Sequence, residues 1–209
     1  HHFCAETARK WAGECVSGKL SPLPSDLAAS CVNSLVEFMD DQGITPLLYD
    51  HLRSRLGLLP PLLQEALSTQ TMRSAAVDRR RSEEIDQVLA QLLESNIDFI
   101  VLKGEALARD YYRVSYQRQR TDIDLLFPNQ DVAEQAWSLL RDRGYRRTHT
   151  LQGDYVGKQF TCSLNLAGNV FAHFDLHTSI SDYLWFSRRL PYHELQENLR
   201  WVGSDSLQV

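Results

Sequence analysis

The sequence predicts an α+β protein in which an N-terminal helical region precedes a small mixed β-sheet with helices on one face. In residues 1–95, apolar side chains recur at the three- and four-residue spacing of amphipathic helices. From residue 97 onward the pattern changes to short apolar runs bounded by glycines, which is typical of strands. We therefore expect a helical domain over residues 1–95 and an α/β domain over residues 96–209.

The helical domain is expected to contain several helices with recognisable starts and stops. Prolines and N-cap residues mark helix starts, and Gly43 marks an end. The predicted helices span Ala5–Val16, Pro24-Ser25-Asp26 to Gly43, Thr45-Pro46 to Leu56, and Pro60-Pro61 to about Ser95. Apolar residues recur at helical spacing in the second helix, at Leu27, Cys31, Leu35 and Phe38. The last helix carries the apolar residues Leu63, Ala66, Met72, Ala76, Ile85, Leu89 and Leu92.

The second half alternates strands and helices before it ends in strands. Pro128 opens a helix and Gly144 closes it, which is the usual placement of these two residues. The predicted order is β-α-β-α-β-β-β, with strands at residues 97–102, 121–127, 145–150, 158–166 and 170–177 and helices at residues 105–112 and 128–144.

The bulk composition excludes some classes of protein. A net charge of −5 argues against a protein that coats nucleic acid, and no apolar run approaches the ~18 residues of a membrane helix. The scattered cysteines, Cys4, Cys15, Cys31 and Cys162, indicate reduced, mostly buried thiols in a cytoplasmic protein. The chain begins without Met or a signal-peptide pattern and ends on strand-like residues, so we expect it to be trimmed at both ends.

Two acids two residues apart, Asp122 and Asp124, stand at the start of a predicted strand. Alternate residues of a strand share a face, so both carboxylates point the same way, and a metal ion is their natural partner. A later strand places a third acid, Asp175, between His173 and His177 on one face. Three such acids predict a two-metal site for phosphoryl chemistry, in which Asp175 also orients or deprotonates an attacking hydroxyl.

A strand-to-helix turn at Lys103-Gly104 offers a place for phosphate groups. Glycine permits tight turns and close approach, and a helix N-terminus presents free N–H groups. The alternative is a plain tight connection with a solvated lysine. Arg120 adds positive charge on the face of Asp122 if the strand extends back that far, and can pair with a carboxylate or with a triphosphate.

Other charged and aromatic residues near these motifs allow two interpretations each. The charge run at residues 78–84 is interpreted as a solvated helix face, and the alternative is that its arginines reach a nucleotide or acceptor. Tyr111, Tyr112 and Tyr116 either pack against the helical half or stack on a base.

The motifs together resemble a known family. Leu102-Lys103-Gly104, Arg120 to Leu125 and Phe174 to His177, together with Gly43 to Tyr49 upstream, are similar to the uncharacterised nucleotidyltransferase family of the polymerase-β-like superfamily. This resemblance implies a nucleotidyltransferase core that binds NTP and Mg²⁺ (or Mn²⁺). Glu105 departs from the wider superfamily, which has serine after the glycine, and a glutamate aimed at a phosphate would repel it.

The resemblance also implies a role for each residue. Asp122, Asp124 and Asp175 would be the catalytic, metal-binding acids. Lys103, Gly104 and Arg120 would hold the phosphates, and His173 and His177 would support the metal ligands.

The leading hypothesis is an enzyme that transfers a nucleoside monophosphate from an NTP to a hydroxyl and releases pyrophosphate. The acidic chain favours a small-molecule or protein acceptor over a long nucleic acid. One alternative is an inactive nucleotide-sensing or partner-binding module. Another is a D-x-D glycosyltransferase, although such enzymes have an α/β region where this chain is expected to be helical.

Overall fold

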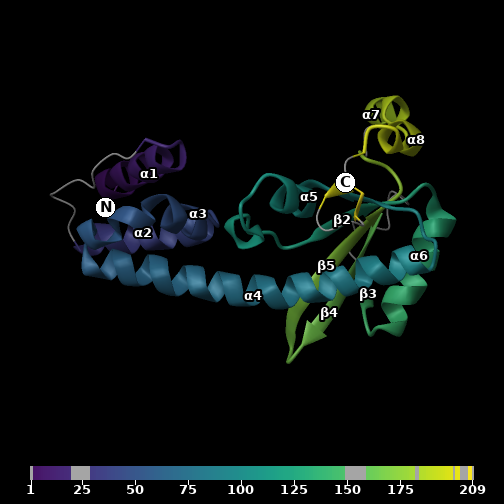
Figure 1. Ribbon diagram of the computed structural model, residues 1–209, viewed down its shortest axis with the longest axis horizontal. Helices are drawn as coiled ribbons and strands as arrows, with labels where there is room; N and C mark the ends of the chain where they lie inside the picture. The colour runs from purple at the N-terminus through teal and green to yellow at the C-terminus, as the bar shows by residue number, and fades with distance from the viewer. Residues whose placement is uncertain are drawn as a thin grey trace. The chain divides into compact units, whose positions relative to one another are not determined.

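The computed structural model describes residues 2–19, 29–148, 159–181, 184–199, 201–202 and 207–208. The chain forms two compact units, the first comprising His1–Arg79 and Arg113–Gln119 and the second Arg80–Tyr112 and Arg120–Val209. One long helix, α4 (Pro61–Glu94), contributes its first part to one unit and its last part to the other (Figure 1). The predicted domain boundary after residue 95 stays a prediction.

The first unit is helical, as predicted. It contains α1 (His2–Val16), α2 (Ala29–Asp41), α3 (Thr45–Leu52), the 3₁₀ turn η1 (Arg53–Leu58), the start of α4 and the 3₁₀ turn η2 (Ser115–Gln117). Gly43 follows α2 with a φ of +65°, and a Cβ there would lie 2.8 Å from Oε1 of Gln119. This position therefore requires glycine. The predicted helix start at Ser25-Asp26 and the predicted core residue Leu27 lie outside the described residues.

Three details of the first unit add to or correct the interpretation of the sequence. On α4, Leu63 and Leu67 are buried, whereas Met72 is largely exposed. Ala76 is also exposed. Cys31 is disulfide-bonded, so the prediction of a reduced thiol is wrong at this position, whereas Cys15 and Cys162 are free and buried. The predicted cytoplasmic location stays a prediction.

The second unit is built on a five-stranded mixed sheet in the order β1-β2-β5-β4-β3. The strands are β1 (Ile100–Leu102), β2 (Ile123–Leu126), β3 (Arg146–Thr148), β4 (Gln159–Leu166) and β5 (Asn169–His177). β2 and β5 are parallel, and the other neighbouring pairs are antiparallel. The predicted strand order along the chain and the α+β class are confirmed.

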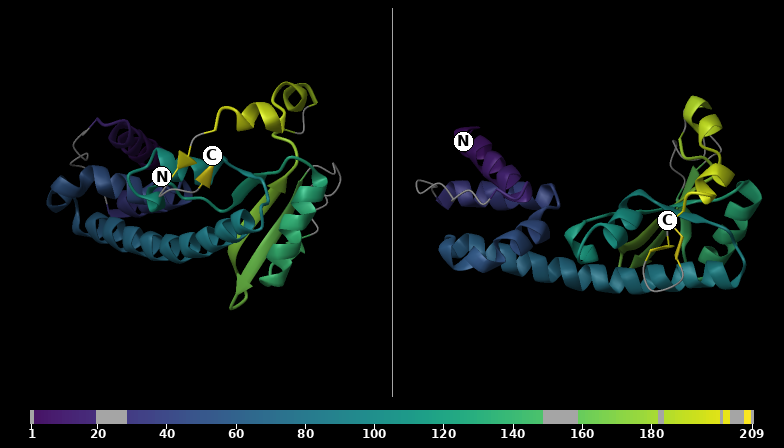
Figure 2. Two further views of the ribbon diagram at one scale, coloured as in Figure 1. Left: turned by 45° about the vertical axis from the view of Figure 1, so that its right-hand side comes forward. Right: turned by 45° about the horizontal axis from the view of Figure 1, so that its top comes forward.

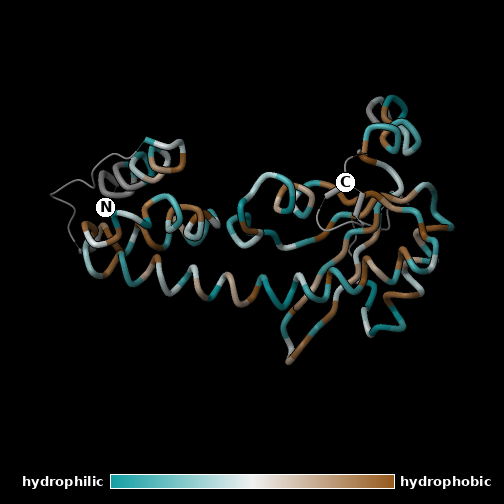
Figure 3. The backbone as a smooth tube through the Cα atoms, in the orientation of Figure 1, coloured by the Kyte–Doolittle hydropathy of each residue, from teal (hydrophilic) through white to brown (hydrophobic). Residues whose placement is uncertain are grey.

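Helices cover one face of this sheet, as Figures 1 and 2 show for α4 and α6 (Gln130–Asp142). Asn129 caps α6 by accepting a hydrogen bond from the backbone N–H of Val132 at 3.0 Å. The strands supply every second residue to a core shared with both helices, and they are among the most hydrophobic parts of the chain in Figure 3. This core includes Ile85, Leu89, Leu92, Val101, Ile123, Leu125, Ala136, Leu140, Phe160, Phe174 and Leu176.

The remaining elements of the second unit are short. α5 (Lys103–Asp110) follows β1 directly, and α7 (Leu184–Arg189) and α8 (Tyr192–Gln196) follow β5. β6 (Trp201–Val202) and β7 (Leu207–Gln208) form a separate two-stranded sheet, so the predicted strand at the C-terminal end is present. None of the helices in the described parts of the chain has the length and apolar character needed to cross a membrane.

Candidate active site

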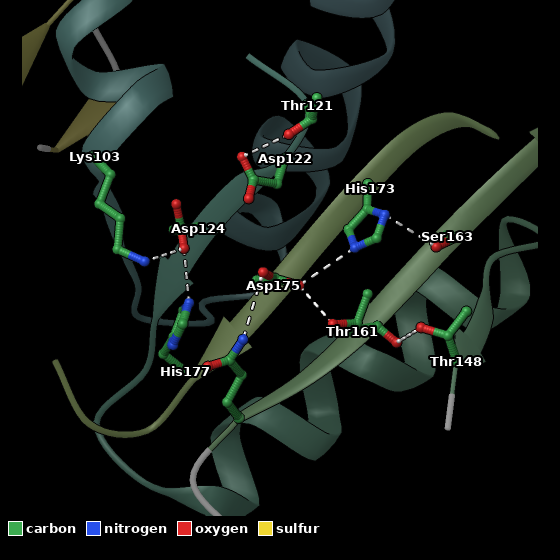
Figure 4. A network of polar contacts seen from close by, with 11 residues as sticks. Lys103, Thr121, Asp122, Asp124, Thr148, Thr161, Ser163, His173, Asp175 and His177 are labelled. Carbon is green, nitrogen blue, oxygen red and sulfur yellow. Dashed lines mark hydrogen bonds and ion pairs between the residues drawn. The ribbon is translucent and has the colours of Figure 1, made fainter. Parts of the chain in front are cut away.

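The face of the sheet opposite the helices carries a row of polar side chains (Figure 4). Asp124 of β2 and Asp175 of β5 are register partners on neighbouring parallel strands, and Thr161 of β4 is the partner of Asp175. Neighbouring strands lie about 4.8 Å apart, so the pairing alone brings the two carboxylates together. Two strands that are distant in the sequence thus place two of the predicted acids side by side.

Asp124 is buried and sits between two cationic or hydrogen-bonding groups. Its Oδ1 lies 2.7 Å from Nζ of Lys103 and 2.9 Å from Nε2 of His177. Burial alone would raise the pKa of this carboxyl group. The hydrogen bonds and charge of His177 and Lys103 outweigh burial, so the pKa of Asp124 lies below its ordinary value of 3.8. Asp124 is therefore held as a carboxylate.

Asp175 is held by side chains of β4 and β5. Thr161 Oγ1 donates to Asp175 Oδ1 at 2.6 Å, and Gln159 Nε2 donates to Oδ2 at 3.5 Å. Nε2 of His173 lies 3.5 Å from Oδ1, and Nδ1 of the same ring lies 3.4 Å from Oγ of Ser163. These contacts fix the orientation of the Asp175 carboxylate.

Asp122 directly precedes β2, which begins at Ile123. Its described hydrogen bond is with Thr121 Oγ1, at 3.5 Å (Figure 4). It is not part of the group of potential metal ligands found among the described residues, which comprises Asp124, Asp175 and His177. The predicted metal-binding role of Asp122 therefore stays a prediction.

The turn between β1 and α5 differs from the prediction in one respect. Lys103, not Gly104, adopts the left-handed conformation, with a φ of +49°. An L-residue is strained in this region by about 1 kcal/mol or more, and such strain is typical of functional sites. A Cβ at Gly104 would lie 3.5 Å from the Cβ of Arg120, so there is ordinary van der Waals room for one. The backbone freedom that we predicted for Gly104 is thus needed one residue earlier.

Glu105 does not face solvent. Its side chain is fully buried, Oε1 accepts from Nε of Arg109 at 2.6 Å, and Oε2 accepts from Nε of Arg120. Burial would raise the pKa of Glu105, but the charges and hydrogen bonds of Arg120 and Arg109 lower it below the ordinary value. The carboxylate is therefore not placed to repel a phosphate that approaches from solvent.

β2 begins at Ile123 and does not extend back to Arg120, so Arg120 and Asp122 do not share a strand face. Its described side-chain partner is Glu105, and its carbonyl accepts a hydrogen bond from Nη1 of Arg81. The solvated-face interpretation of the charge run is wrong for Arg81, because its guanidinium contacts the segment that leads into β2. The predicted phosphate-binding role of Arg120 stays a prediction.

The described donor set fits a divalent metal ion. Asp124, Asp175 and His177 each offer one ligand atom, and these atoms lie within 4.8 Å of one another. Opposite ligands of a six-coordinate ion are about 4.2 Å apart at bond lengths of about 2.1 Å and about 4.8 Å apart at bond lengths of about 2.4 Å, so atoms that all lie within 4.8 Å of one another can share one coordination sphere. Two carboxylates and an imidazole are suitable ligands for such an ion.

The sequence predicted the two acids and the two histidines of this face, but not the polar residues of β4 that contact Asp175 and His173. Gln159, Thr161 and Ser163 alternate with the apolar residues Phe160, Cys162 and Leu164. That period-2 pattern predicts a polar face on β4, and the polar face meets the acids through strand pairing.

One comparison with known proteins identifies a family for the chain. The model of the uncharacterised nucleotidyltransferase family matches residues 30–207, which is most of the chain. The chain belongs to the uncharacterised nucleotidyltransferase family. No curated protein and no solved structure is significantly similar to it. The matched residues of this nucleotidyltransferase family member include Lys103, Asp122, Asp124, Asp175 and His177.

Proposed function

We propose that this chain is a metal-dependent nucleotidyltransferase that transfers a nucleoside monophosphate from an NTP to a hydroxyl acceptor and releases pyrophosphate. The observation that carries the proposal is the pairing of Asp124 with Asp175 across β2 and β5, with Lys103 2.7 Å from Asp124. Family membership supports nucleotidyl transfer as the reaction class.

The acids would hold the ion and prepare the acceptor. Asp124 and Asp175, with Asp122 beside them, are the proposed ligands of Mg²⁺ or Mn²⁺, which when bound offsets negative charge on the phosphates. Asp175, fixed by Thr161, would accept the proton of the acceptor hydroxyl. The acceptor oxygen then forms its bond to the α-phosphorus as the bond from the α-phosphorus to pyrophosphate breaks.

Lys103 would exchange partners when the nucleotide binds. Its side chain is 60% exposed although Nζ contacts the buried Asp124. A flexible ammonium group of this kind can move from a carboxylate to a phosphate without losing its charge compensation. The backbone N–H groups at the start of α5, including that of Gly104, would add to this phosphate-binding turn.

The proposal is tested by incubating the protein with labelled NTPs, Mg²⁺ or Mn²⁺ and candidate acceptors. Small molecules and proteins are tried first, because the acidic chain disfavours long nucleic acids. We expect labelled product and pyrophosphate from the wild-type protein, and a loss of at least ~10³-fold in the D122N/D124N double variant, since the charge-stabilising centre is removed.

The matched control is Asp142→Asn, which removes an exposed carboxylate at the end of α6 and should leave transfer unchanged. Equal transfer by the wild-type protein and the D122N/D124N variant would contradict the proposal. Tight NTP binding without product would instead favour the nucleotide-sensing module.

A further inference from the structure

His177 occupies a position that the predicted roles do not explain fully. It is the last residue of β5, two residues after Asp175 and therefore on the same face of the sheet. Its side chain is 10% exposed, and its Nε2 points at Asp124 (Figure 4). A residue that only orients a ligand usually contacts it from outside the coordination sphere, whereas a ring nitrogen of His177 belongs to the group of potential ligand atoms.

The distances fit direct coordination. Nε2 of His177 and Oδ1 of Asp124 are 2.9 Å apart, close to the spacing of about 3.0 Å between adjacent ligands of an octahedral ion. A ligand atom of Asp175 completes the group within 4.8 Å. With the ion bound, the hydrogen bond between Nε2 and Asp124 would be replaced, and an imidazole with its proton on Nδ1 would present the lone pair of Nε2 to the ion.

The backbone holds His177 in place. β5 pairs with β2 up to its last residue, and the carbonyl of His177 accepts a hydrogen bond from the N–H of Phe127 at 2.8 Å. The position is therefore fixed by the same strand pairing that brings the two acids together. No rearrangement of the backbone is needed for a ligand at this point.

We propose that His177 is a direct ligand of the metal ion, and that the site consequently prefers Mn²⁺ to Mg²⁺. The inference rests on the proposed function and specifies the ion. Mg²⁺ is usually bound through oxygen atoms, whereas imidazole suits transition metals, and carboxylate ligands accept Mn²⁺ as well. His173 differs in that its Nε2, 3.5 Å from Asp175, does not belong to the ligand group among the described residues.

The test is the electron spin echo envelope modulation of Mn²⁺ bound to the whole chain without nucleotide. We expect modulation from a directly coordinated ¹⁴N nucleus in the wild-type protein, and its replacement by a ¹⁵N pattern after labelling with ¹⁵N-histidine. His177→Gln should abolish the modulation and lower the ratio of Mn²⁺ to Mg²⁺ affinity at least about tenfold, the scale on which metal sites respond to lost support. His173→Gln should keep both the nitrogen modulation and the ratio of Mn²⁺ to Mg²⁺ affinity.

Bound Mn²⁺ without nitrogen modulation would overturn the inference, and so would a wild-type protein that does not bind Mn²⁺. Because the labelled wild-type protein needs no substitution, misfolding of a variant cannot hide the result. The readout is also independent of turnover. Nitrogen coordination without transfer would support the inference and contradict the proposed function, whereas transfer without nitrogen coordination would do the reverse.

Discussion

Two buried carboxylates in the second unit, Glu105 and Asp124, are neutralised in different ways. Glu105 is paired with two arginines that are themselves mostly buried, Arg109 and Arg120. Asp124 is paired with a largely exposed lysine, Lys103, and with His177. If Arg109 or Arg120 moved away from Glu105, a buried charge would remain unpaired, which is costly. Lys103, in contrast, can turn to solvent or to a ligand. The first centre is suited to fix structure and the second to exchange partners.

The largest effect on stability is expected from replacing Glu105, the carboxylate held by two buried arginines. Glu105→Gln leaves Arg109 and Arg120 without their shared counter-charge, so we expect the free energy of unfolding to fall by about 3–5 kcal/mol. Denaturant titration measures this loss. The control is Glu94→Gln at the exposed end of α4, which should change stability by less than about 0.5 kcal/mol. A loss as small as that of the control would show that the buried pair does not stabilise the fold.

Acid should reduce the contributions of both Glu105 and Asp124 to the stability of the fold. The pKa values of Glu105 and Asp124 are lowered in the folded protein, so the unfolded chain binds protons first and stability decreases as the pH falls. The contribution of each group is complete above its ordinary pKa, 4.5 for Glu105 and 3.8 for Asp124, and is lost as the pH falls through the lowered value. Unfolding measured between pH 6 and about pH 2 should therefore show a shallower pH dependence in Glu105→Gln. An unchanged slope would contradict the paired state of Glu105.

A smaller effect is expected from replacing Lys103, the exposed partner of Asp124. Lys103 has a positive φ, so Lys103→Gly should be more stable than Lys103→Ala by about 1 kcal/mol, because only the alanine variant keeps the steric strain. Both variants lack Nζ, and both should bind NTP more weakly than the wild-type protein. Denaturant titration and calorimetry with a non-hydrolysable NTP measure the two effects. Equal stability of the two variants would mean that this turn is not strained.

The sequence was sufficient to predict the fold class because its two periodicities are distinct. The helical periodicity that includes Leu35 in α2 and Leu63 in α4 appears in the structure, and so does the strand alternation around Asp124 and Asp175. The predicted alternation is also observed at Asp124, which lies on the face opposite the buried Ile123 and Leu125, whereas Asp122 precedes the strand.

Local sequence patterns could not predict which residues pair across the sheet. Strand register makes Asp124 the neighbour of Asp175 and brings Thr161 to Asp175, and no spacing along the chain encodes that choice. The burial of Glu105 likewise depends on Arg120, which is fifteen residues away in the sequence and meets it only in the folded unit. Met72 is exposed although it is one of the apolar residues of α4, because the apolar stripe of a long helix need not face one core throughout.

A crystal structure with a non-hydrolysable NTP and Mn²⁺ tests the central claim most directly, because the anomalous signal of Mn²⁺ locates the ion independently of its ligands. We predict an ion bound between Asp124 and Asp175, with the triphosphate contacted by Lys103 at the start of α5. A nucleotide bound elsewhere, with no ion at these two carboxylates, would contradict the account.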